Sequence, residues 1–165
     1  MMPAVFWHLA RFRGAQELQN LHPLLVHYPI AFLTASVPIY FLAWILSSET
    51  LELTGLWLLG LGTLGAAAAV CTGLWGSMGV MIAPSVREHI LVYHEWSMLA
   101  VLALSTVLAV WALLARPMPR KGRTCFMIGL VLMTAVLIKG ADYGGWMVFG
   151  YNAGGSLPQP IEFSQ

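Results

Sequence analysis

The chain contains very few charged residues, and this scarcity indicates its class. Only 9% of its 165 residues are Asp, Glu, Lys or Arg, whereas 59% are hydrophobic. Because a soluble domain carries about 25% charged residues, a chain of this composition cannot hide its apolar surface within itself. The formal net charge is +1 and no basic cluster indicates nucleic-acid binding. We therefore expect the lipid bilayer, and no nucleic acid, as a partner.

Cysteine is scarce as well, which limits the redox chemistry open to the chain. Cys71 lies late in the second apolar run and Cys125 begins the fourth. These positions place them at very different depths of an up-down bundle, too far apart for a disulfide. We expect both to be small core residues. No nucleophile constellation or phosphate-binding loop is apparent, so a hydrolase or a nucleotide enzyme is not expected.

Four long apolar runs are each able to cross a bilayer as a helix, which takes about 20 residues. A membrane barrel would instead need about eight or more short alternating segments. The sequence therefore predicts an all-α, integral membrane four-helix up-down bundle over residues 21–151. The four runs are 24–46, 56–81, 90–115 and 125–149.

The flanking segments and the loops predict the orientation. Residues 1–20 place aromatic side chains beside Arg11 and Arg13, a pattern typical of a short helix in the membrane surface, and residues 152–165 form a tail. The loop after the third run carries four basic residues, and short cytoplasmic loops favour Lys and Arg. We expect this loop in the cytoplasm and both termini on the periplasmic side of a bacterial inner membrane.

Four of the five histidines form two pairs with identical spacing, each at the start of an apolar run. His22 and His27 lie in HPLLVH, and His89 and His94 lie in HILVYH. The two hexapeptides align without a gap, which indicates two parallel helical hairpins related by an axis along the membrane normal. Because the first and third helices of an up-down bundle run parallel, both pairs are expected at the outer face.

Helical geometry separates the roles of the four histidines. Residues five apart differ by about 7.5 Å along the axis and about 140° around it, so one helix cannot direct both members of a pair at one metal. The inner members, His27 and His94, are predicted to be the axial ligands of a haem b iron. The outer members, His22 and His89, would hydrogen-bond a propionate, bind a second metal or lie at the interface.

Other polar and aromatic residues near this end have two interpretations each. Lys139 and Asp142 are spaced i, i+3, so Lys139 either neutralises a haem propionate or forms a structural ion pair. Trp96 either forms part of the wall of the cofactor pocket or belongs to the aromatic belt at the interface. The small residues from Gly60 to Gly73 permit close helix packing or leave room for a flat cofactor.

The segment LHPLLVHYPIA, the histidine at the start of the third span and the closing GGWMVFGY resemble a family of small bacterial predicted membrane proteins of unknown function. Its motifs are His-Pro-x-x-Val-His-Phe-Pro-Ile and Gly-Gly-x-Leu-Val-Tyr-x-x-Gly, and the resemblance covers Leu21 to Tyr151. Tyr28 and the run 147–149 depart from them conservatively. The matching positions are His22, His27, Pro29, Gly144 and Gly145, and we group these two glycines with the cofactor-binding residues. The family's domain is sometimes found beside c-type cytochrome domains, which implies membrane electron transfer.

The leading hypothesis is a haem b-binding electron-transfer protein, or a subunit of a respiratory or photosynthetic complex, rather than a self-contained enzyme. Two imidazole ligands give a six-coordinate iron, which favours electron transfer over oxygen chemistry. Its partners would be other membrane subunits or a periplasmic c-type cytochrome. Two alternatives stay open: a Cu, Zn or non-haem Fe site built from the four histidines with Glu95 or Asp142, and a structural subunit of a larger complex.

Overall fold

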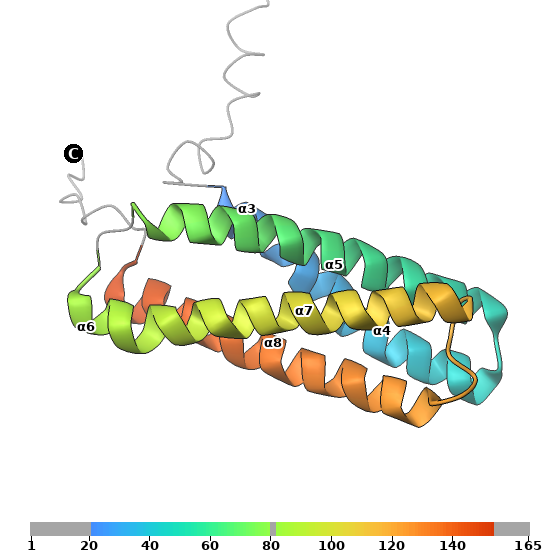
Figure 1. Cartoon of the computed structure of the whole chain (residues 1–165). Helices are drawn as coiled ribbons and strands as arrows, with labels where there is room; N and C mark the ends of the chain where they lie inside the picture. The colour runs from blue at the N-terminus through green and yellow to red at the C-terminus, as the bar shows by residue number, and fades with distance from the viewer. Residues whose placement is uncertain (1–20, 80–81, 154–165) are drawn as a thin grey trace, which may run out of the picture.

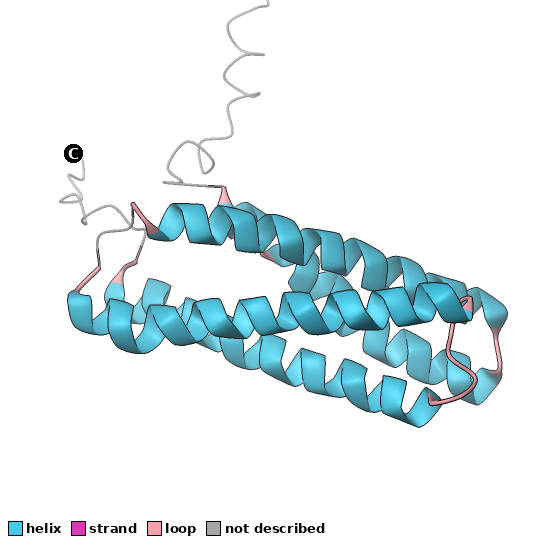
Figure 2. Cartoon of the chain, viewed as in Figure 1, coloured by secondary structure: helices cyan, strands magenta, loops and turns pink. Residues whose placement is uncertain are grey.

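The computed structural model describes residues 21–79 and 82–153, and this part of the chain consists of helices joined by short connections (Figures 1 and 2). The first span comprises α3 (His22–Leu25) and α4 (His27–Leu46), and the second is α5 (Glu49–Ser77). The third comprises α6 (Pro84–Val86), the π-helix η1 (Arg87–Leu91) and α7 (Val92–Ala115), and the fourth is α8 (Arg123–Tyr151). The expected interfacial helix of residues 1–20 and nearly all of the tail lie outside the described residues.

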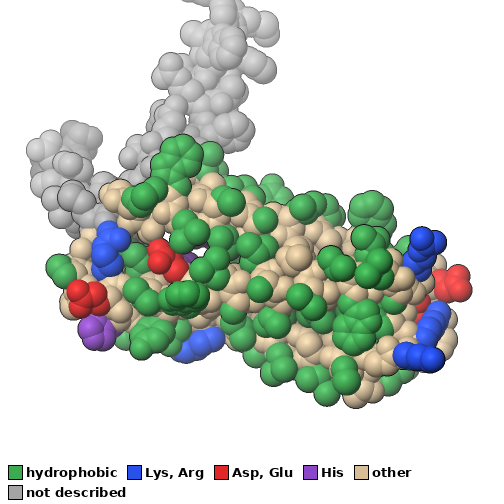
Figure 3. Space-filling model, in the orientation of Figure 1, with side chains coloured by type: hydrophobic (Ala, Val, Ile, Leu, Met, Phe, Trp, Pro, Cys, Tyr) green, Lys and Arg blue, Asp and Glu red, His purple; other side chains and the backbone are tan. Residues whose placement is uncertain are grey.

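The four spans run up and down along one bundle, and their outer surface is apolar. Each span contains an apolar stretch of 18 residues, with hydropathy between 1.7 and 2.4, of which only 22% to 33% is buried. Hydrophobic side chains cover much of the face seen in Figure 3, while most of its charged side chains gather toward the two ends. A bundle with this surface requires lipid around it, so the prediction of an all-helical four-span membrane protein is confirmed.

Glycine allows the helices to approach one another closely in the core. A Cβ atom added to Gly62 would lie 2.6 Å from the Leu33 side chain, and one added to Gly129 would lie 2.8 Å from Leu108. Contacts of this kind are the usual source of attraction between membrane helices, where no hydrophobic force operates. The two cysteines, by contrast, are exposed on the outer surface, which corrects their expected place in the core. Lipid-facing and core-facing positions are equally apolar in this chain, so residue type alone does not separate them.

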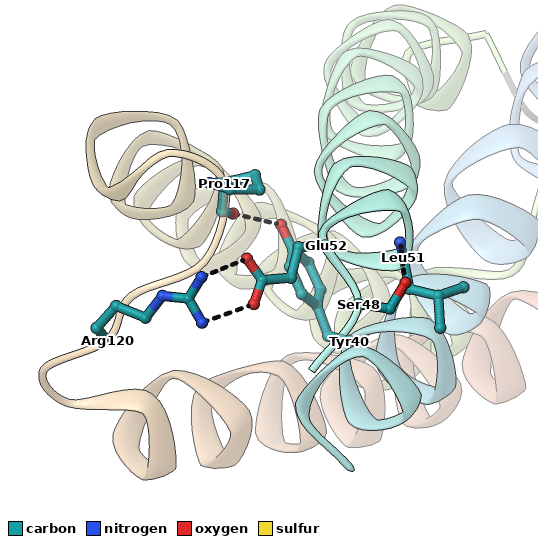
Figure 4. Close-up of polar contacts among 6 residues, drawn as sticks. All are labelled: Tyr40, Ser48, Leu51, Glu52, Pro117 and Arg120. Carbon is teal, nitrogen blue, oxygen red and sulfur yellow. Dashed lines mark hydrogen bonds and ion pairs between the residues drawn. The ribbon is translucent and has the colours of Figure 1, made fainter. Parts of the chain in front are cut away.

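An ion pair between a buried carboxylate and an exposed guanidinium fixes the loop that joins α7 to α8 (Figure 4). The carboxylate of Glu52, whose side chain is 1% exposed, accepts from Arg120 with N–O distances of 3.1 and 3.4 Å. The Tyr40 hydroxyl donates to the carbonyl of Pro117 over 3.3 Å, and its ring packs edge-on against Phe126. The basic loop is thereby attached to both α4 and α5 at the end of the bundle opposite to α3.

Helix irregularities mark the other end. The first span is divided at Val26, one turn before Pro29, because proline has no N–H to donate to the carbonyl four residues earlier. The third span has a π-helical turn, η1, between α6 and α7, just ahead of His94. Its first residues, α6 and η1, project beyond the start of α3 (Figure 1). This offset determines which histidine of the first span lies level with His94.

Candidate cofactor cavity

A largely apolar cavity of about 550 Å³ lies where α3 and α7 begin and α5 and α8 end. This volume falls within the range of about 300–1,000 Å³ found for ligand and cofactor sites. All four spans contribute to its wall. The residues that bear on its chemistry are His22, His27, Ala69, Gly73, His94, Glu95, Gly144 and Gly145.

His22 is held against α5 by its backbone. The ring Nδ1 lies 2.8 Å from the carbonyl oxygen of Ala69, and a Cβ atom added to Gly73 would lie 2.9 Å from the ring Cε1. A carbonyl oxygen can only accept, so Nδ1 carries the proton and the lone pair of the neutral ring is on Nε2. The missing side chain at Gly73 makes the space into which the ring fits.

His94 is held against α8 in the same way. Its Nδ1 donates to the carbonyl oxygen of Gly140 over 2.7 Å, and a Cβ atom added to Gly144 would lie 3.0 Å from the ring Cε1. The acceptor nitrogen of this ring is again Nε2. Each histidine therefore uses one backbone carbonyl and, four residues later on the same helix, one glycine.

The two rings meet across the cavity. Their centroids are 6.2 Å apart and their planes make an angle of 86°. Ala69, whose carbonyl binds His22, lies 47 residues after it, and Gly140, whose carbonyl binds His94, lies 46 residues after it. The internal repeat therefore pairs His22 with His94. The gapless alignment of HPLLVH with HILVYH had paired His22 with His89, and the structure corrects that register. The two hexapeptides start at different heights, because the third span begins at Pro84 and projects beyond α3.

The other two histidines lie apart from this contact. His27 lines the cavity but its side chain is exposed, and the ring that contacts His94 belongs to His22 rather than to His27. His89 is exposed, and its Nδ1 donates to the carbonyl oxygen of Ser85 on its own helical segment over 3.0 Å. His89 therefore lies outside the cavity wall, and of the roles expected for it, a place at the interface is the one that its position fits.

Lys139 and Trp96 also face away from the cavity. Lys139 pairs with Asp142 over 2.8 Å, and both side chains are more than half exposed. Because the Gly140 and Gly144 face of α8 is turned toward His94, Lys139 lies on the outer side, and the structural ion pair is the arrangement observed. Trp96 is 69% exposed, since two residues after His94 correspond to about 200° around the helix. Its position fits the aromatic belt.

Several members of the site were not identified from the sequence. Gly73 and the carbonyls of Ala69 and Gly140 anchor the rings, and the interval from each histidine to its glycine is the pattern that would have revealed them. Glu95 was considered as a ligand for a non-haem metal or as a proton acceptor in quinol oxidation, and it lines the cavity half-buried beside His94. Over residues 21–79 and 82–153, no three His, Cys, Asp or Glu side chains converge as a metal-ligand group.

These features define a multi-pass, four-helix membrane protein with two backbone-anchored imidazoles facing each other in an apolar cavity. The chain belongs to the predicted membrane protein family DUF2231, whose model matches residues 18–156. Comparisons with curated proteins and with solved structures found no match.

Proposed function

We propose that the protein binds haem b between His22 and His94 and serves as an electron-transfer protein or subunit in the membrane. The observation that carries this proposal is the pair of anchored rings with centroids 6.2 Å apart. Two metal–nitrogen bonds of about 2 Å each, together with the radii of the two rings, separate the centroids of axial imidazoles by about 6 Å. The spacing therefore suits one metal ion held between the rings.

The hydrogen bonds at Nδ1 support a ligand role for both histidines. A metal-bound histidine almost always donates its other ring N–H to a carbonyl, carboxylate or water, which fixes the ring orientation and raises its basicity. The carbonyls of Ala69 and Gly140 supply this contact. Both rings thus have the backbone partner that a metal-bound histidine needs.

The cavity supplies what a large apolar cofactor needs. Bound haem would contribute a one-electron redox centre. His22 and His94 would both hold the iron, which favours electron transfer over oxygen chemistry, and the apolar wall would exclude water from the site. A two-histidine set suits haem because the porphyrin brings four nitrogens of its own. The four-histidine alternative for Cu, Zn or non-haem Fe would need His89, which is bonded to Ser85 outside the cavity.

The charge distribution supports the orientation proposed for this function. Arg116, Arg120, Lys121 and Arg123 lie at the end opposite to the cavity, and short loops rich in Lys and Arg favour the cytoplasm. This orientation in a bacterial inner membrane places the termini and the cavity at the periplasmic face. A periplasmic c-type cytochrome, or another membrane subunit, would then exchange electrons there.

The test is an absorption spectrum of protein purified from cells supplied with haem. We expect sharp reduced-minus-oxidised bands of low-spin haem b, lost in His22→Ala and His94→Ala and retained in the matched control His89→Ala. A colourless preparation with haem in excess overturns the proposal, and bound copper or zinc without haem supports the non-haem alternative. Loss of the bands in His27→Ala but not in His22→Ala would restore His27 as the ligand.

A further inference from the structure

A second cavity, of about 450 Å³, lies at the opposite end of the bundle, between the start of α5 and the end of α7. It lies under the basic loop and is separate from the histidine cavity. Four charged side chains, three leucines and a proline form its wall. The lining residues are Glu49, Glu52, Leu53, Leu56, Leu113, Arg116, Pro117 and Arg120.

Two of its charges neutralise each other, and two do not. Glu52 and Arg120 form the ion pair that fixes the loop. Glu49 and Arg116 are exposed at the mouth of the cavity, and neither takes part in the ion pairs found within residues 21–79 and 82–153. The cavity therefore offers one carboxylate and one guanidinium, with no net charge, to an incoming molecule.

The leucines connect this charged mouth to the lipid-facing surface. Leu53 is 50% exposed and Leu113 is 61% exposed, and both belong to membrane spans, while Leu56 is partly buried beneath them. The groove thus begins at the charged mouth and continues along an apolar surface that faces lipid tails. A molecule that fits both parts has a charged head and a hydrocarbon chain.

We propose that this groove binds the headgroup of a zwitterionic phospholipid with a primary amine, phosphatidylethanolamine. Arg116 would bind the phosphate, because a guanidinium presents paired N–H donors to phosphate oxygens. Glu49 would accept hydrogen bonds from the ammonium, and one acyl chain would lie along Leu53, Leu56 and Leu113. An anionic headgroup would meet the Glu49 carboxylate without a compensating ammonium. A choline headgroup has no N–H to donate to Glu49.

Native mass spectrometry of the delipidated full-length protein tests this site independently of haem. Phosphatidylethanolamine, phosphatidylglycerol and phosphatidylcholine with identical acyl chains are added in turn. We expect phosphatidylethanolamine to bind best, since loss of one charge-assisted hydrogen bond weakens binding by about tenfold. Glu49→Gln should abolish the preference over phosphatidylcholine, and Glu49→Asp should retain it.

Two further variants separate a built site from general attraction to the basic loop. Arg116→Gln should weaken binding of all three lipids, while Lys121→Gln, which removes one charge from the same loop outside the groove, should change none of them. Circular dichroism confirms that each variant is folded. The proposal is overturned if phosphatidylglycerol binds as well as phosphatidylethanolamine, if Glu49→Gln keeps the preference, or if Lys121→Gln and Arg116→Gln act alike.

Discussion

The rings of His22 and His94 stand edge to face with their centroids 6.2 Å apart, although each ring is anchored within its own helical hairpin. His22 is bonded to α5, which follows it, and His94 is bonded to α8, which follows it. Each hairpin therefore carries a complete half-site consisting of an imidazole, a carbonyl and a glycine. Packing of the two hairpins brings the half-sites together.

The glycines beside the rings provide the first prediction. In Gly144→Ala the new methyl group would lie 3.0 Å from Cε1 of His94, so the ring must shift and its bond to Gly140 weakens. Changes to such orienting contacts cost about 10- to 100-fold in metal affinity, and we expect haem affinity to fall by about tenfold or more. Gly73→Ala should act likewise through His22. Haem titration followed by absorbance measures both effects.

Gly145→Ala is the matched control for this prediction. The neighbouring glycine also lines the cavity, but the nearest atom to its added Cβ belongs to Phe149 at 4.0 Å. Its haem affinity should stay within about twofold of the wild type, because no ring has to move. Equal losses in Gly144→Ala and Gly145→Ala would show that the effect comes from α8 as a whole rather than from His94.

The proposed ligand role of the histidines provides the second prediction, tested by chemical rescue. In His94→Gly the proposed bond to the haem iron would be lost, so the low-spin spectrum should disappear and the reduced protein should bind carbon monoxide at the iron. Added imidazole should restore the low-spin bands, since it replaces the missing ring without a backbone link. His89→Gly should keep the wild-type spectrum throughout. Failure of imidazole to restore the spectrum of a folded His94→Gly protein would indicate a structural role for His94.

The four spans could be predicted from the sequence because length and hydropathy suffice for a membrane helix. The start of each span could not be predicted as well. The third span begins at Pro84, earlier than its apolar run, because α6 and η1 contain the charged residues Arg87 and Glu88. Counted from the start of its span, His94 therefore lies several residues further along than the apolar run predicted. Its ring contacts His22 rather than His27.

The site was predicted in part for a related reason. Helical spacing predicted that one helix directs a single histidine at a shared centre, and His94 is one of the two rings that meet. The partner ring depended on helix offset, which hydropathy does not encode. The sequence also did not show that Trp96 and Lys139 lie on the outer faces of α7 and α8. A bilayer makes the outer face of a helix as apolar as its packed face.

The third prediction concerns the ion pair at the opposite end of the bundle. Arg120→Gln leaves the Glu52 carboxylate, which is 1% exposed, without its cation. An unsatisfied buried group costs about 1–3 kcal/mol, so the free energy of unfolding should fall by about this amount. Glu52→Leu combined with Arg120→Leu should recover most of the loss, because replacement of both partners by apolar groups leaves no buried carboxylate without a partner. Thermal or denaturant unfolding in detergent measures the difference.

Lys139→Gln is the contrasting variant for the ion pair. It removes the cation of a pair whose two side chains are more than half exposed, and pairs of that kind contribute little to stability. We expect no measurable change in unfolding. If Lys139→Gln destabilised the protein as much as Arg120→Gln, burial of Glu52 would not be the cause of the loss.

The fourth prediction concerns the π-helical turn η1, which precedes His94. A π-helical turn accommodates one extra residue within a helix, so removal of one residue from it leaves an α-helical turn with both flanks in place. Deletion of His89, which is exposed and lies outside the cavity wall, should therefore leave His94 bonded to Gly140. The haem-to-protein ratio should stay near that of the wild type.

Deletion of Val107 is the matched control, because this residue is also exposed in the third span but lies within the regular helix α7. A regular helix has no spare residue, so the deletion rotates one flank by about 100° relative to the other. Either His94 leaves the cavity or the core residues Leu108 and Ala112 leave their contacts, and haem binding should be lost. If deletion of His89 proved as damaging as deletion of Val107, the extra residue would itself be needed to shape the cavity.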